Sequence, residues 1–108
     1  MLYELRTYRA MPGRMPDLLK RFREHTCVIW ERIGITQVGF WTVMIGDSNH
    51  DLIYILAWDS LADRESKWQR FIADPAWHEA RAASEANGPL AQTVTNQILS
   101  PTDFSSLR

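Results

Sequence analysis

The sequence predicts an α+β fold, in which a four-stranded antiparallel sheet carries helices on one face. Two observations lead to this prediction. Short alternating or β-branched segments and longer segments of helical periodicity follow one another in the order β-α-β-β-α-(α)-β, a split-βαβ pattern. The 108 residues are the usual size of one domain, and 45% are hydrophobic, which suffices for a sizeable core. We therefore expect a single domain over residues 1–108, with 100–108 as a C-terminal tail.

The first predicted strand covers residues 2–10, because apolar and polar side chains alternate along it. One face suits a core and carries Tyr3, Leu5 and Thr7. The other face is mixed and carries Leu2, Glu4, Arg6 and Tyr8.

Residues 15–33 are predicted to form one helix, since apolar side chains recur at helical spacing. The apolar face is formed by Leu18, Leu19, Phe22, Thr26, Ile29 and Ile33. Charged residues occupy much of the remaining surface, namely Arg21, Arg23, Glu24, Glu31 and Arg32. Pro16 suits the first helical turn, and Gly34 is a standard helix stop.

Residues 35–46 and 52–58 are rich in β-branched and aromatic side chains and are predicted to pair as a hairpin. Both faces of the second strand are apolar. One face carries Leu52, Tyr54, Leu56 and Trp58, and the other carries Ile53, Ile55 and Ala57. The helices can cover only one face, so we expect the other to meet a second copy of the chain in a sheet-to-sheet homodimer. The alternative is that the tail folds back over it.

Two further helices and one strand complete the predicted fold. Ser60 opens the first of these helices, with Asp63 three residues later in a weak form of the capping box. Asp74-Pro75 stops this helix and starts the next, predicted over 76–86, because Asp is a favoured N-cap and Pro a favoured first helical residue. The last strand is predicted over 92–100. The complete pattern is ferredoxin-like.

Charge and cysteine content restrict the possible partners and compartments. The net charge is −1 and the basic residues are dispersed, so nucleic-acid binding is not expected. Cys27 is the only cysteine, which excludes an intrachain disulfide and suits a reducing cytoplasm. We find no signal peptide and no apolar run of the roughly 20 residues that cross a bilayer.

Established motifs for metals and cofactors are absent from the sequence. There is no Gly-rich phosphate loop, no Cys-x-x-Cys and no Gly-x-Ser-x-Gly. None of His25, His50 and His78 has a second ligand at metal spacing, so neither a metal nor a cofactor is predicted. Cys27 lies mid-helix near the apolar stripe and is expected to be a buried small hydrophobe rather than a nucleophile.

Several blocks together resemble the NIPSNAP family, part of the dimeric α/β-barrel superfamily. They are YELRTYR at 3–9, MPGRMPDLLKRFREH, VGFWTVMIGDSNHDLIYILAWDSLADRE, DPAW, and the closing ILSPTDFSSL. The resemblance covers nearly the whole chain. It implies a ferredoxin-like monomer paired through its sheet, with a cavity between sheet and helices. Superfamily relatives include monooxygenases, haem-degrading enzymes and muconolactone isomerases. The mitochondrial association of eukaryotic members is not carried over, because their targeting segment is missing.

Eight residues are candidates for binding a small molecule: Arg6, Tyr8, Trp41, Tyr54, Arg64, Trp68, Trp77 and His78. Arg6 could hold an anionic ligand, with Tyr8 as hydrogen-bond donor. Alternatively, Glu4 and Arg6 pair across the dimer interface. Arg64 could instead pair with Asp59 or Asp63. The tryptophans could line a pocket or be ordinary core.

His78 and Tyr54 are weak candidates for catalysis, because one has a titratable ring and the other a hydroxyl. His78 could equally be an exposed ring bonded to Glu79 or Asp74. The leading functional hypothesis is a homodimer that binds a small apolar or aromatic molecule in a cavity reached by Tyr54, Trp77 and His78. The alternatives are a non-enzymatic interaction or regulatory module, a cofactor-independent monooxygenase or isomerase, or haem binding through His25 or His78.

Overall fold

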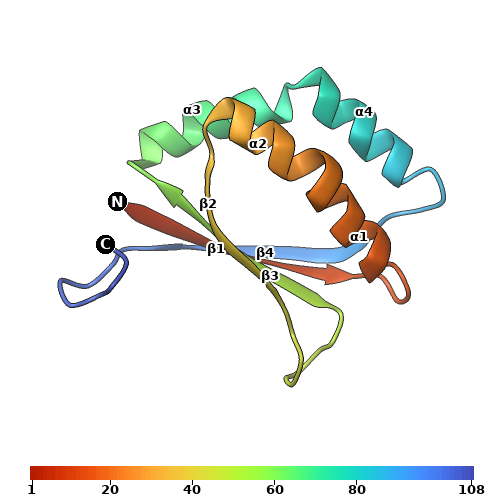
Figure 1. Cartoon of the computed structure of the whole chain (residues 1–108), viewed down its shortest axis with the longest axis horizontal. Coiled ribbons are helices and arrows are strands. Elements are labelled where there is room, and N and C mark those ends of the chain that lie inside the picture. The colour runs from red at the N-terminus through yellow and green to blue at the C-terminus, as the bar shows by residue number, and fades with distance from the viewer.

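The computed structural model describes residues 1–108 and confirms the predicted architecture. Four antiparallel strands lie in the order β2-β3-β1-β4, and the helices pack on one face of the sheet (Figure 1). The elements are β1 (Leu2–Ala10), α1 (Met15–Arg21), the π-helical η1 (Phe22–Thr26), α2 (Cys27–Ile33), β2 (Thr36–Thr42), β3 (Asp51–Trp58), α3 (Leu61–Ile72), α4 (Pro75–Ser84) and β4 (Ala91–Leu99). None of the helices combines the length and apolar character that a bilayer crossing requires.

The predicted helix caps are present. The Ser60 hydroxyl accepts a hydrogen bond from the Asp63 amide at 3.1 Å, and the Asp63 carboxylate accepts one from the Asp59 amide at 3.0 Å. Asp74 caps α4 by accepting a hydrogen bond from the Ala76 amide at 2.9 Å. These caps satisfy amide groups that have no partner within the helix, which explains where α3 and α4 begin.

Three segments differ from the prediction. α4 ends at Ser84, two residues before the predicted end of that helix. The long first helix contains a π-helical turn, Phe22–Thr26, between α1 and α2. β2 ends at Thr42 instead of residue 46, because β3 begins at Asp51 and pairs Leu52 with Thr42. Residues 43–50 therefore have no strand opposite them and form a connecting loop.

The core lies between the sheet and the helices. From β3 it receives Leu52, Tyr54, Leu56 and Trp58, which were predicted to share one face and are each at most 1% exposed. Phe22 and Trp30 from the first helical segment and Phe71 from α3 pack against this strand face. Trp30 is 1% exposed, although it was not part of the predicted apolar face of this helix. Arg21 was predicted on the charged surface but is only 6% exposed.

The opposite side of the sheet, here called the open face, is not covered by any helix (Figure 1). The strand registers place on it Tyr3, Leu5, Ile53, Ile55 and Trp41. Trp41 is 51% exposed, and its ring lies over Gly39, where a Cβ atom would come within 2.8 Å of it. The open face is therefore both apolar and accessible in the isolated chain.

Candidate functional site

β1 directs Glu4, Arg6 and Tyr8 toward the helices, not toward the open face. Glu4 is 0% exposed, and Tyr8 packs against the buried core. This corrects the prediction that Tyr3, Leu5 and Thr7 face the core. The alternation was read correctly, but the two faces were assigned the wrong way round. Glu4 and Arg6 do pair, at 3.0 Å, but between sheet and helices rather than across a dimer interface.

The Glu4 carboxylate is the centre of a buried polar group, here called the Glu4 cluster. It accepts hydrogen bonds from Arg64 Nε (2.7 Å) and Nη2 (3.0 Å) and from Arg6 Nη1 (3.0 Å). Trp58 Nε1 (3.0 Å) and Asn96 Nδ2 (2.9 Å) complete the set. Burial alone would raise the pKa of Glu4, but the hydrogen bonds from Arg64, Asn96 and Arg6 outweigh it and lower the pKa to about 2. Glu4 is thus a carboxylate at neutral pH.

Arg6 links the Glu4 cluster to the aromatic core. Its Nε donates a hydrogen bond to the Tyr54 hydroxyl at 2.7 Å, and its guanidinium lies 4.6 Å from the centre of the Trp68 ring. Burial opposes the charged form of Arg6, but Tyr54 and Tyr8 outweigh it, so the pKa of Arg6 is raised. Burial and the neighbouring Tyr8 raise the pKa of Tyr54 well above its ordinary value. Tyr54 therefore stays protonated near neutral pH, which disfavours it as a general base.

Five of the eight predicted ligand residues meet in or beside this cluster: Arg6, Tyr8, Tyr54, Arg64 and Trp68. Arg64 pairs with Glu4, so the predicted pairing of Arg64 with Asp59 or Asp63 is wrong. Glu4, the acceptor that organises the group, was not among the predicted site residues. Its only sequence signal is an acidic side chain on a strand face shared with Arg6.

The other three predicted residues lie elsewhere. Trp41 is on the open face, and Trp77 packs against Phe71 with their ring centres 4.8 Å apart. His78 is exposed, and its Nε2 contacts the carbonyl of Ile72, not Glu79 or Asp74. The Asp74 carboxylate is instead paired with Arg32 at 2.7 Å.

None of Tyr54, Trp77 and His78, where a cavity was predicted, lines either of the two pockets described below. The Tyr54 ring is surrounded by other rings, with Phe40 at 5.0 Å, Phe22 at 5.3 Å and Trp30 at 5.6 Å between centres. Ordinary packing fills that space.

A smaller apolar pocket does lie between sheet and helix. Its volume is about 200 Å³, and it is lined by Leu19, Phe22, Arg23, Cys27, Phe40 and Leu52. Phe22 and Phe40 also contact the Tyr54 ring, whose hydroxyl accepts the hydrogen bond from Arg6, and Arg6 is not in the lining of the apolar pocket. Burial raises the pKa of Cys27, which keeps its sulfur as a thiol and makes it a poor nucleophile.

The π-helical turn forms one wall of the apolar pocket, through Phe22 and Arg23. Such turns occur frequently at functional sites. On the same helical segment, Thr26 Oγ1 and Trp30 Nε1 are buried without a hydrogen-bond partner, which is uncommon for polar atoms in a protein interior. Hydrophobic spacing did not reveal the π-helical turn.

The histidines do not support a metal or haem site. No group of three or more His, Cys, Asp or Glu side chains is placed to hold a metal ion. His25 lines a polar pocket in which only Ala80 and Ala83 are hydrophobic, and His78 is exposed. Haem binding would require the ring of His25 or His78 to face an open apolar pocket. His25 faces a polar pocket and His78 is exposed.

Comparison with known proteins gives one family and several related structures. A family model described as NIPSNAP matches residues 3–106. Protein Atu4242 from Agrobacterium tumefaciens is 32% identical with a TM-score of 0.86, and the alignment covers 100% of each chain. A NIPSNAP family protein from the same organism, Atu5224, is 31% identical with a TM-score of 0.88, covering 99% of this chain and 98% of the other.

A more distant structure shares the fold alone. It is a protein from Nitrosomonas europaea, provisionally assigned as an antibiotic biosynthesis monooxygenase. It is 9% identical with a TM-score of 0.65, and the alignment covers 94% of this chain and 98% of the other. No curated protein matches the chain at a significant level.

Proposed function

This chain belongs to the NIPSNAP family, and from that premise we propose that it works as a homodimer that binds a small apolar or aromatic molecule between sheet and helix. The observation that carries the proposal is the apolar pocket of about 200 Å³ beside the π-helical turn. Drug-sized ligands occupy pockets of roughly 300–1,000 Å³. The ligand is therefore a small molecule, of one ring or a short chain.

The lining of the apolar pocket defines the chemistry of the ligand. Phe22 and Phe40 offer ring faces and edges, and Leu19 and Leu52 offer aliphatic surface. Arg23 is the only charged residue in the lining, and it is exposed. An aromatic ring or alkyl group with one acidic substituent, held by Arg23, fits this arrangement.

The homodimer is the second part of the proposal. The open face carries apolar residues from three strands, including Leu5, Ile55 and Trp41, and no helix of the same chain covers them. Two copies placed sheet against sheet would bury this surface, as the α/β-barrel resemblance implies. The tail also carries exposed apolar side chains, Phe104 at 84% and Leu107 at 51%, which suit contact with a partner's sheet edge.

We place binding ahead of catalysis. The Glu4 carboxylate is fully engaged in hydrogen bonds, and Tyr54 is held protonated and enclosed. A non-enzymatic interaction or regulatory module is therefore the second candidate. An oxygenase or isomerase activity has the support of fold similarity alone, which does not carry function. We also propose a cytoplasmic location. The argument for it is that Cys27 is a free thiol, which suits a reducing compartment.

The ligand proposal can be tested with benzoate, which joins one apolar ring to an acid. Wild-type protein should bind it saturably, with shifts of pocket amide signals in two-dimensional NMR spectra. Cys27→Phe should fill the apolar pocket and abolish most of these shifts. Val28→Phe is the matched control, because Val28 is the next residue of α2 and is 58% exposed outside the pocket. Equal benzoate binding by the two variants would refute the pocket as the ligand site.

A further inference from the structure

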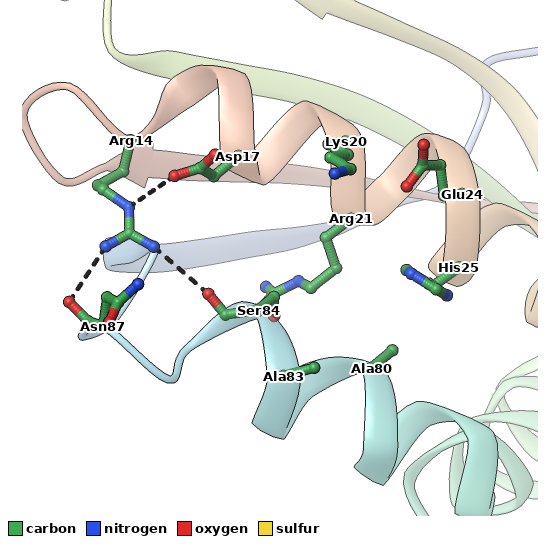
Figure 2. Close-up of a pocket in the computed structure, with 10 residues that line it drawn as sticks. All are labelled: Arg14, Asp17, Lys20, Arg21, Glu24, His25, Ala80, Ala83, Ser84 and Asn87. Carbon is green, nitrogen blue, oxygen red and sulfur yellow. Dashed lines mark hydrogen bonds and ion pairs between the residues drawn. The ribbon is translucent and has the colours of Figure 1, made fainter.

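A second pocket, here called the polar pocket, lies between α1–η1 and α4 (Figure 2). Its volume is about 310 Å³, and it is lined by Arg14, Asp17, Lys20, Arg21, Glu24, His25, Ala80, Ala83, Ser84 and Asn87. The polar pocket and the apolar pocket lie on different sides of the first helical segment, and they share no lining residue. The proposed function makes no use of it.

Arg21 is the buried charge in this pocket. Its side chain is 6% exposed and reaches from α1 toward α4 at Ser84 (Figure 2). Nη1 donates a hydrogen bond to the Ser84 hydroxyl at 3.3 Å and lies 3.8 Å from the Glu85 carboxylate, while Nε is buried without any acceptor. Burial lowers the pKa of Arg21, and Glu85 offsets this only in part. The guanidinium also lies 5.2 Å from the centre of the Trp77 ring. A buried guanidinium with so few hydrogen-bond acceptors is unusual.

The neighbouring charges leave the polar pocket with a positive excess. Asp17 is already paired with Arg14 at 3.1 Å, and Arg14 also donates to the carbonyls of Ser84 and Asn87. Glu85 is shared with Arg81, at 3.2 Å. Lys20 forms no ion pair within the chain.

Glu24 is the one carboxylate in the lining that forms no ion pair. Two basic side chains of the lining offset this single negative charge: Lys20, which forms no ion pair, and Arg21, whose carboxylate partner Glu85 is 3.8 Å away. The balance therefore favours an anion, not a cation.

We propose that the polar pocket binds the oxyanion group, phosphate or carboxylate, of a small molecule, with Arg21 beneath it and Lys20 beside it. Guanidinium and ammonium groups are donors that oxyanions accept from, whereas the Ser84 hydroxyl already donates to the Arg81 carbonyl at 3.0 Å. An oxyanion would provide the Arg21 guanidinium with an acceptor. Within the chain, its Nε has none and its Nη1 has only the Ser84 hydroxyl and the more distant Glu85 carboxylate. This site does not depend on the apolar pocket or on dimerisation.

The test is a titration of the full-length protein with sodium phosphate and, separately, sodium acetate, at constant pH and ionic strength. Binding is followed by amide and Arg side-chain shifts in two-dimensional NMR spectra. Saturable shifts are expected at Lys20, Arg21 and Ser84. Binding by phosphate alone, by acetate alone, or by both supports the site, and the ratio of affinities identifies the preferred oxyanion.

Two neighbouring alanines of α4 provide matched variants. Ala83 lines the polar pocket and Ala82 does not, although both are exposed. Ala83→Glu places a competing carboxylate in the pocket and should weaken binding at least about fivefold, whereas Ala82→Glu should leave it unchanged. Lys20→Gln should also weaken binding, against Arg70→Gln as the control of equal charge. Shifts that never saturate, or equal affinities in Ala82→Glu and Ala83→Glu, would overturn the proposal.

Discussion

Arg64 donates two hydrogen bonds to Glu4, from Nε at 2.7 Å and from Nη2 at 3.0 Å, and so ties α3 to the centre of the sheet. Glu4 belongs to β1, which lies between β3 and β4, and its carboxylate is fully buried. Because Arg6 also pairs with this carboxylate, two guanidinium groups share one negative charge. The stability of the helix layer on the sheet therefore depends on the charge of Glu4.

Replacing Glu4 with Gln tests this dependence. The substitution keeps the size of the side chain but leaves Arg6 and Arg64 without their counter-charge. Removing one partner of a buried ion pair is strongly destabilising, so we expect a loss of about 3 kcal/mol in the free energy of unfolding. Urea denaturation measures it. Glu79→Gln, at an exposed position with no ion pair, is the control and should change stability by less than about 0.5 kcal/mol.

The pKa of Glu4 predicts how stability responds to acid. It is lowered from 4.5 in a free side chain to about 2 in the folded protein, so the unfolded state binds the proton more tightly. The stabilisation is fully present above pH 4.5 and is lost as the pH falls toward 2, with a total on the order of 3 kcal/mol. Unfolding curves at several pH values should show this loss in the wild type. Glu4→Gln should lack it; an identical acid dependence in both proteins would contradict the assignment.

Local sequence signals were sufficient to predict most of the fold. Alternation along β1, the β-branched and aromatic content of β3, the stop at Gly34 and the caps at Ser60 and Asp74 act within a few residues, so they can be read directly. Alternation does not say which of two faces the helices cover. Glu4 and Arg6 were placed away from the helices because buried charges are rare. Their burial depends on Arg64, which lies 60 residues away from Glu4.

The two pockets were harder to predict, because each is formed by elements that are distant in the sequence. The apolar pocket combines the π-helical turn with Phe40 and Leu52 from two strands, and hydrophobic spacing does not show the turn. The polar pocket depends on Arg21, which is buried only because α4 packs beside α1. Hydrophobic periodicity reports contacts within one helix or strand. It does not report which distant elements pack together to form a pocket.

The homodimer predicts the effect of a charge on the open face. Ile55 pairs with Leu5 on one side and Gly39 on the other, near the middle of that face. Ile55→Asp would bury an unpaired carboxylate between two sheets, so dimer affinity should fall on the order of 100-fold. Sedimentation velocity at micromolar concentration should show a dimer for the wild type and a monomer for this variant. Val28→Asp, on an exposed helical surface, should remain dimeric. A monomeric wild type would refute the proposed interface.

Asp74 and Pro75 form a structural junction between α3 and α4, and a substitution can show this. Asp74 caps α4 through the Ala76 amide and pairs with Arg32, and this pairing lowers the pKa of its carboxyl group. Asp74→Ala removes both interactions and should cost about 1 kcal/mol of unfolding free energy, while Asp74→Ser keeps a capping oxygen and should cost less. Arg32→Gln removes only the ion pair and should cost least, because the Arg32 side chain is 57% exposed. Chemical denaturation of the three variants gives this order. If Asp74→Ala left stability unchanged but abolished ligand binding, the junction would be functional rather than structural.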